Sequence, residues 1–438
     1  MLRSLSATAA LLMLVPAAAQ ARPGDPDGAF ARRGTVTLKA TGADAVGGAV
    51  KAISGHRVLA GGSAGGKLVV LRLRRSGALD SGFGNHGQVA PALPGTSLDG
   101  VRSLATFRDG RIVAAATLQT ASGAQIALVR FLPSGEIDPS FGNGLGYVIT
   151  GPAGSTLGSM AMDRTGNIVV AAGRASGGGE VPYVLRLAPD GSPDETFGAN
   201  GMVDGAALGL AGRATGVLAR PDGTVVFCTG AGEDRSGPAT FSIVRLLAGG
   251  APDPAFGGTG VVSLPLTPFS GTGAGAAAVR GGPSGTLLVA GTDVTEKGTL
   301  RGVVLRLKAN GTLDPGFGRG GIARISRAGR DLRVTAFTRD GGGRIVLAGA
   351  GDPPDSLLVR LRASGRRDTT FGNGGLTYPK LGRPPGGDPV YTTLDAIEAD
   401  GPNLLLAGSA AGPGPLIRSL GGPATFGGRF ALTVSRLR

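Results

Sequence analysis

Short apolar runs, separated by glycine and aspartate turns, follow one another along almost the whole chain. The clearest run recurs as RVLAGG, RIVAAA, NIVVAA, TVVFCT, TLLVAG, RIVLAG and NLLLAG, starting at residues 57, 111, 167, 224, 286, 344 and 403. Short apolar runs bounded by turn signals are typical of buried strands. Nothing in the pattern predicts helices, so we expect an all-β protein.

Each unit of the pattern contains four such runs. The first is exemplified by GTVTL (34–38), the second by VLARPDG (217–223), which ends in a tight turn, and the third is the run above. The fourth recurs as VVLRL, ALVRF, YVLRL, SIVRL, VVLRL, LLVRL and TVSRL, ending at 73, 131, 187, 246, 307, 361 and 437. Four strands per repeat predict a four-stranded antiparallel blade.

A phenylalanine motif links the units. LDSGFGNHG (79–87) recurs in five further copies such as LDPGFGRGG (313–321), and a degenerate copy, PDGAFARRG, lies at 26–34. The period is about 57 residues, which predicts a single repetitive domain over residues 22–438, a seven-bladed β-propeller. We expect the motif phenylalanines to pack between blades: Phe30, Phe83, Phe141, Phe197, Phe256, Phe317 and Phe371.

The polar turn followed by the LDPSFGxxG-like motif resembles the delta-60 repeat family of exported bacterial proteins. The DG turns are also loosely similar to those of NHL-type propeller repeats. These resemblances imply a β-propeller and little about activity. The chain departs from the family pattern at Ala31, where other copies have glycine, and by one extra residue in FGNGLG (141–146).

A constant spacing pairs an arginine with an aspartate in every repeat. The arginine of each fourth run lies eight residues before the motif aspartate, and we interpret each pair as a guanidinium–carboxylate clasp that holds the turn. The predicted clasps are Arg72 with Asp80, Arg130 with Asp138, Arg186 with Asp194, Arg245 with Asp253, Arg306 with Asp314, and Arg360 with Asp368.

The two chain ends complete one another. The N-terminus supplies a motif and a strand with no arginine run before it, and the C-terminus supplies an arginine run with no motif after it. We therefore expect residues 34–38 to join the last blade, with Arg436 and Asp27 forming a seventh clasp. This pairing would close the ring and remove an exposed sheet edge.

The N-terminal sequence predicts export. Arg3, the apolar stretch 7–15 and Ala19-Gln20-Ala21 have the features of a signal peptide, residues 1–21, so a secreted protein, extracellular or periplasmic, is expected. The single Cys228 lies in an apolar run and is interpreted as a buried hydrophobe. In a secreted chain the net charge of +14 favours anionic glycans, wall polymers or lipid surfaces over nucleic acid as partners, but a solvated basic surface without such a partner is the preferred interpretation.

No catalytic, cofactor or metal set is predicted from the residues. Asp80 with His86 belongs to a repeated turn, and the only other histidine is His56. Four aspartates near inner-strand starts, namely Asp44, Asp99, Asp331 and Asp395, could converge on the axis, but such residues are usually solvated caps. No membrane span and no oligomer are expected, and the partner is unknown.

One face of the expected ring collects the irregular connections: 91–100, 232–240, 264–273, 380–391 and 409–428. Binding residues concentrate on variable loops held by a rigid scaffold. Three functions therefore remain open: a secreted binding or interaction scaffold using this face, with an envelope glycan or a secreted protein as partner; a propeller enzyme resembling lactonases or sugar dehydrogenases; and charge-driven adhesion to envelope polyanions.

Overall fold

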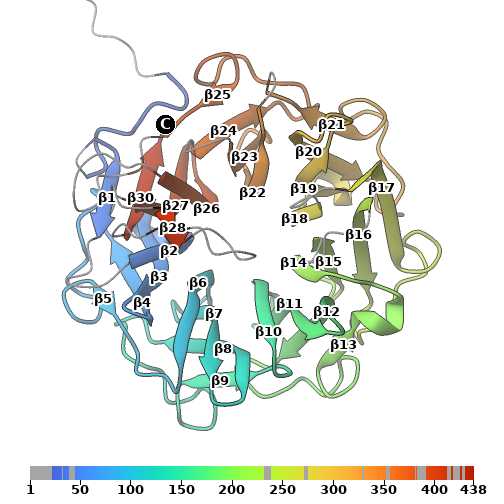
Figure 1. Cartoon of the computed structure of the whole chain (residues 1–438). Helices are drawn as coiled ribbons and strands as arrows, with labels where there is room; N and C mark the ends of the chain where they lie inside the picture. The colour runs from blue at the N-terminus through green and yellow to red at the C-terminus, as the bar shows by residue number, and fades with distance from the viewer. Residues whose placement is uncertain are drawn as a thin grey trace, which may run out of the picture.

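The computed structural model shows a β-propeller, with its sheets arranged around a central opening (Figure 1). The structure describes residues 22–31, 33–38, 45–230, 238–270, 275–327, 330–351, 356–379, 381, 391–411, 416–417, 425–426 and 430–438. The expected signal peptide, residues 1–21, lies outside this set. No helix long and apolar enough to cross a membrane occurs in the described part of the chain.

Five sheets are four-stranded antiparallel blades. Their strands are β2 (Ala45–Ile53), β3 (Arg57–Ala64), β4 (Lys67–Leu73) and β5 (Gln88–Val89); β6 (Thr96–Thr106), β7 (Ile112–Thr120), β8 (Gly123–Phe131) and β9 (Tyr147–Thr150); β10 (Ser155–Met162), β11 (Ile168–Ser176), β12 (Gly179–Leu187) and β13 (Met202–Asp204); β22 (Arg333–Arg339), β23 (Ile345–Ala350), β24 (Ser356–Leu361) and β25 (Leu376–Thr377); and β26 (Tyr391–Asp400), β27 (Asn403–Ala411), β30 (Phe430–Leu437) and β1 (Thr35–Leu38).

Between β13 and β22, eight strands form one continuous hydrogen-bonded sheet. These are β14 (Arg213–Ala219), β15 (Val225–Gly230), β16 (Pro238–Leu246), β17 (Val261–Ser270), β18 (Gly275–Gly281), β19 (Leu287–Val294), β20 (Leu300–Leu307) and β21 (Ile322–Ile325). A two-stranded ribbon, β28 (Leu416–Ile417) with β29 (Thr425–Phe426), and three 3₁₀ segments, η1 (Ser54–His56), η2 (Gly205–Leu208) and η3 (Pro283–Gly285), complete the described elements. These elements include no α-helix, as expected from the sequence.

The prediction of seven four-stranded blades is wrong, because the propeller has five such blades. β15 and β18 are joined by a single antiparallel pairing of Gly230 with Gly275, which merges the strands of two sequence repeats into one sheet. A Cβ on Gly230 would lie 2.8 Å from the carbonyl oxygen of Ala276, so only glycine permits this approach. Counting repeats along the sequence therefore does not count separate sheets.

The chain ends meet as predicted. β1 pairs antiparallel with β30, with Thr35 opposite Ser435 and Thr37 opposite Thr433. The sheet order β1-β30-β27-β26 places the first strand on the outer edge of the last blade. The N-terminal strand thus covers the edge of β30 that would otherwise be open.

The core lies between the sheets, because the middle strands of each sheet are apolar on both faces. Every residue of β15 and β24 is buried, as are the first seven residues of β7. All seven motif phenylalanines are 0% exposed, and they belong to hydrophobic clusters that include residues of two neighbouring repeats. Full burial of each ring is consistent with the expected packing between repeats.

Candidate functional site: the central channel

The predicted clasp residues lie together in all seven repeats. In each, the arginine Nε donates to Oδ2 of the aspartate at 2.6 to 2.8 Å. The arginine Cζ also lies 4.4 to 4.9 Å from the centroid of the motif phenylalanine ring. Each repeat therefore holds an arginine between a carboxylate and an aromatic face, an arrangement in which packing and charge act together.

The clasps also connect neighbouring repeats. Arg72 donates through a terminal nitrogen to the carbonyl of Pro133 at 2.5 Å, and Arg186 donates to the carbonyl of Ala248 at 2.6 Å, each about one repeat further along the chain. A backbone bond repeats the pattern, since Gly84 N donates to Ser134 O at 2.7 Å. These contacts give the clasp residues a structural role, because they tie each repeat to the next.

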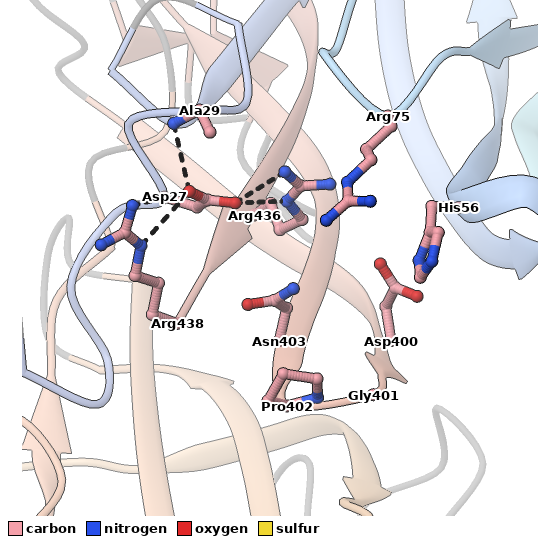
Figure 2. Close-up of a pocket in the computed structure, with 10 residues that line it drawn as sticks. All are labelled: Asp27, Ala29, His56, Arg75, Asp400, Gly401, Pro402, Asn403, Arg436 and Arg438. Carbon is pink, nitrogen blue, oxygen red and sulfur yellow. Dashed lines mark hydrogen bonds and ion pairs between the residues drawn. The ribbon is translucent and has the colours of Figure 1, made fainter.

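The Asp27 clasp lies where the two chain ends meet, beside a small pocket of about 340 Å³ (Figure 2). Asp27 accepts from Arg436 at 2.7 Å and from Arg438 at 3.2 Å. Burial raises the pKa of Asp27, but bonds from the Ala29 N–H and the two arginines outweigh it and lower the pKa below its ordinary value. Asp27 therefore stays ionised at neutral pH.

Four of the six candidate catalytic or metal-binding residues have described side chains, and these four, His56, His86, Asp331 and Asp395, lie apart from one another. His56 lines the Figure 2 pocket near Asp400, and His86 lies at positive φ in its motif turn. Asp395 lines the channel described below, whereas Asp331 accepts from the Leu300 N–H. Asp44 and the side chain of Asp99 lie outside what the structure describes, and no group of three or more metal-ligating side chains occurs within the described ranges.

A cavity of about 1230 Å³ forms a channel along the propeller axis. It is lined by the innermost strands, which surround the central opening in Figure 1: β2, β6, β10, β14, β18, β22 and β26. Three of the irregular loops expected to form a binding face, at 232–240, 380–391 and 409–428, lie largely outside the described residues, whereas residues 264–270 belong to β17. The channel wall, by contrast, is described in every inner strand.

A β-bulge occurs at the equivalent position of every inner strand. The unpaired residues are Gly48, Arg102, Gly158, Thr215, Ala277, Thr335 and Asp395, and all of them line the channel. Bulges redirect side chains and are over-represented beside functional sites. The channel wall therefore carries, at a single level, seven bulge residues whose side-chain directions are altered by the bulge. We call this level the bulge belt.

Four of the bulge residues, Gly48, Gly158, Thr215 and Thr335, lie against the carbonyl of the residue just before the next bulge, which holds neighbouring bulges at one level. Thr215 Oγ1 donates to the carbonyl of Ala276 at 2.7 Å, and Thr335 Oγ1 donates to that of Leu394 at 2.5 Å. A Cβ on Gly158 would collide with the carbonyl oxygen of Ala214. The inner strands are thus held in a common register, and residues equally far from their bulges share a level.

Charged side chains occupy three levels of the wall. Arg213 and Arg333 lie two residues before their bulges, and Arg102 and Asp395 are bulge residues. Lys51, Arg280 and Glu398 each lie three residues after their bulges. With five cationic and two acidic side chains, the lining carries a net charge of +3.

Two of these cations are neutralised by carboxylates. Lys51 Nζ lies 2.6 Å from Glu398 Oε1, joining β2 to β26, and Arg213 NH2 lies 2.9 Å from Glu180 Oε1. Burial raises the pKa of Glu398, with Lys51 and Arg280 acting in the opposite direction. The Arg280 side chain is exposed to the channel but surrounded by the channel wall, and this partial desolvation lowers its pKa, a change that Glu398 opposes.

Of the charged residues that line the channel, the sequence pattern singles out Asp395 but not Arg102, Arg213, Arg280 or Arg333. Aligning the inner-strand runs on their bulges would have shown them, because charged residues interrupt the otherwise small and apolar stretches at fixed offsets. A bulge, however, leaves no reliable signal in a single sequence.

The fold and its repeats define the class: the chain is a repeat protein of the β-propeller class. Five segments, residues 108–141, 165–197, 220–256, 282–317 and 343–371, match the family described as a domain of unknown function (DUF5122) beta-propeller. These matches, together with the structure, support a β-propeller repeat family. The delta-60 relationship and export stay predictions.

Solved structures with a similar fold have diverse names. They include a catalytically inactive virginiamycin B lyase from Staphylococcus aureus with quinupristin (TM-score 0.47, 11% identity, covering 92% of this chain and 98% of that one). Drosophila Semaphorin 2a gives a TM-score of 0.49 at 9% identity, covering 95% and 76%, and a glucose dehydrogenase gives 0.39 at 12%, covering 76% and 95%. Comparison with curated proteins gives no match.

Proposed function

We propose that the protein is a binding module that takes its ligand in the central channel. The observation that carries this proposal is the cavity of about 1230 Å³, large enough for an oligomeric ligand and lined by a belt of bulged strands. The closed ring of sheets around the channel holds the lining residues at fixed positions. This proposal keeps the binding-scaffold function expected from the sequence. It differs in the location of the binding site, which is the channel wall and not the face with the irregular loops.

Secretion is part of this proposal and rests on the sequence of residues 1–21 alone. An exported module of this kind would meet envelope polysaccharides or secreted proteins. The enzyme alternative finds less support, because Asp395 and Glu398 are both already engaged: Thr393 Oγ1 donates to Asp395 at 2.9 Å, and Glu398 is paired with Lys51.

A channel-blocking variant tests the proposal. Ala161 lies three residues after the bulge of β10, at the level where sister strands carry Lys51, Arg280 and Glu398, so this level accommodates long side chains. Ala161→Trp should obstruct the channel without disturbing the ring. The matched control is Ala121→Trp, in the exposed turn between β7 and β8.

The assay is calorimetric titration of residues 22–438 and both variants with a panel of envelope polysaccharide fragments and secreted proteins. The proposal predicts that the ligand which binds the parent protein binds the Ala121→Trp variant equally and the Ala161→Trp variant at least tenfold more weakly. Equal binding by all three proteins, with unchanged melting temperatures, would place the ligand outside the channel.

A further inference from the structure

Two arginines of the channel wall have no carboxylate partner among the residues that the structure describes. Arg280 on β18 and Arg333 on β22 are both solvent-exposed in the channel, and neither forms an ion pair with any described residue. Within the described part of the chain, Arg280 donates to the carbonyl of Val279 at 3.1 Å, and its Cζ lies 5.8 Å from the ring centroid of Phe337. Guanidinium groups of this kind are suited to carboxylate, sulfate or phosphate groups of a ligand.

The two arginines lie at different levels of neighbouring inner strands. Arg333 precedes its bulge by two residues, and Arg280 follows its bulge by three. With a rise of about 3.3 Å per residue, and with the bulge adding one unpaired residue, the two levels are on the order of 13 Å apart. A ligand that contacts both must be extended and must carry at least two acidic groups.

The rest of the lining indicates the chemical class. Hydroxyl side chains line the same cavity: Ser103, Thr106, Thr215, Thr335, Thr338 and Thr393. The described lining contains no aromatic ring, and single-stranded nucleic acids are usually held by aromatic stacking platforms. Cations combined with hydroxyls suit an anionic, polyhydroxylated chain.

We infer that the channel ligand is an acidic oligosaccharide and that Arg280 and Arg333 bind its acidic groups at two levels. This inference rests on the proposed function, because it names the chemistry of the same site. The net charge of +14 over the chain adds a general attraction to such ligands but does not select the channel.

Glu398 competes with the ligand for the cations at the level of Arg280, three residues after the bulges. It faces Lys51 of β2 and Arg280 of β18, with Asp395 on its own strand as the nearest acidic neighbour in the lining. While Glu398 is ionised, its charge attracts both cations. Since burial raises the pKa of Glu398, protonation begins at a higher pH than for an exposed glutamate, and acidification should then release the two cations and strengthen anion binding.

The test uses a galacturonate tetramer as the anionic probe and maltotetraose as the neutral probe of equal length. Titrations use residues 22–438 and the variants Arg280→Ala, Arg333→Ala and Glu398→Gln. The matched control is Arg339→Ala, an exposed arginine on β22 that does not line the cavity. Melting temperatures verify that each variant folds.

The inference predicts that the galacturonate tetramer binds more tightly than maltotetraose. Each of Arg280→Ala and Arg333→Ala should weaken its binding about ten- to a hundredfold, and Arg339→Ala should not change it. Glu398→Gln should strengthen binding at neutral pH and remove the gain seen on acidification.

Three results would overturn the inference. If the galacturonate tetramer and maltotetraose bound equally tightly, the acidic groups of the oligosaccharide would play no part in its recognition. If Arg280→Ala and Arg339→Ala weakened galacturonate binding by the same factor, the binding would be due to general surface charge and not to the channel arginines. Absence of binding to either probe would exclude this ligand class. The proposed function would survive all three if another ligand bound and Ala161→Trp abolished its binding.

Discussion

The clasp between the chain ends gives the sharpest stability prediction. Asp27 is 6% exposed and Arg436 is 4% exposed, with Arg436 NH2 2.6 Å from Asp27 Oδ2. Asp27→Ala would leave the guanidinium buried without its carboxylate and would also remove the acceptor of the Ala29 N–H. Breaking a buried ion pair in this way costs about 3–5 kcal/mol of unfolding free energy.

This cost can be expressed as a melting temperature. With an unfolding entropy of about 2.1 cal/mol/K per residue over roughly 400 residues, a loss of 3–5 kcal/mol lowers Tm by about 4–6 °C. Differential scanning calorimetry of residues 22–438 measures this shift. Deletion of residues 22–40 removes the whole β1 segment together with Phe30, so a larger fall is expected.

The matched control is Asp80→Ala, which removes the equivalent carboxylate from a clasp within one blade (Arg72 Nε to Asp80 Oδ2, 2.8 Å). Both variants should lose stability, but only Asp27→Ala should increase protease cleavage within residues 22–38, because only there does the clasp fix a chain end. An unchanged Tm for Asp27→Ala, or equal cleavage of the two variants, would refute the closure argument.

Three further predictions concern the repeats and the core. Ala31→Gly should raise stability by about 1 kcal/mol in chemical denaturation, because Ala31 has φ 47° where sister repeats have glycine; a loss would show that the site is unstrained. In Asp27, Asp80, Asp138, Asp194 and Asp368, burial raises the pKa but hydrogen bonds and arginines lower it further, so their stabilisation should be present above about pH 4 and lost as pH falls below it; a flat Tm between pH 5 and pH 2 would contradict this. Burial raises the pKa of Cys228 to about 12, so thiol reagents should label it only on unfolding, and rapid native labelling would contradict its burial.

Much of the fold could be predicted from sequence because its determinants are local and repeated. The spacing of eight residues between Arg72 and Asp80, found in six pairs, depends on a strand and a turn of fixed length. The pairing of Asp27 with Arg436 followed from the incomplete units at the two ends. These features depend on chain order, which a sequence displays directly.

The blade count and the channel could not be predicted in the same way. One contact between two glycines, Gly230 and Gly275, joins strands of neighbouring repeats, and no periodicity reports it. The charged levels of the channel depend on bulges that bring residues of different repeats into register, as for Lys51 and Glu398. Such placement is a property of packing between sheets rather than of the pattern within one repeat.

The most direct test of the central claim is a crystal structure of residues 22–438 with the galacturonate tetramer. We expect electron density for the oligosaccharide along the propeller axis, with acidic groups within hydrogen-bond distance of Arg280 and Arg333. A tetramer bound to the outer surface of the ring, with the channel holding only water, would contradict it.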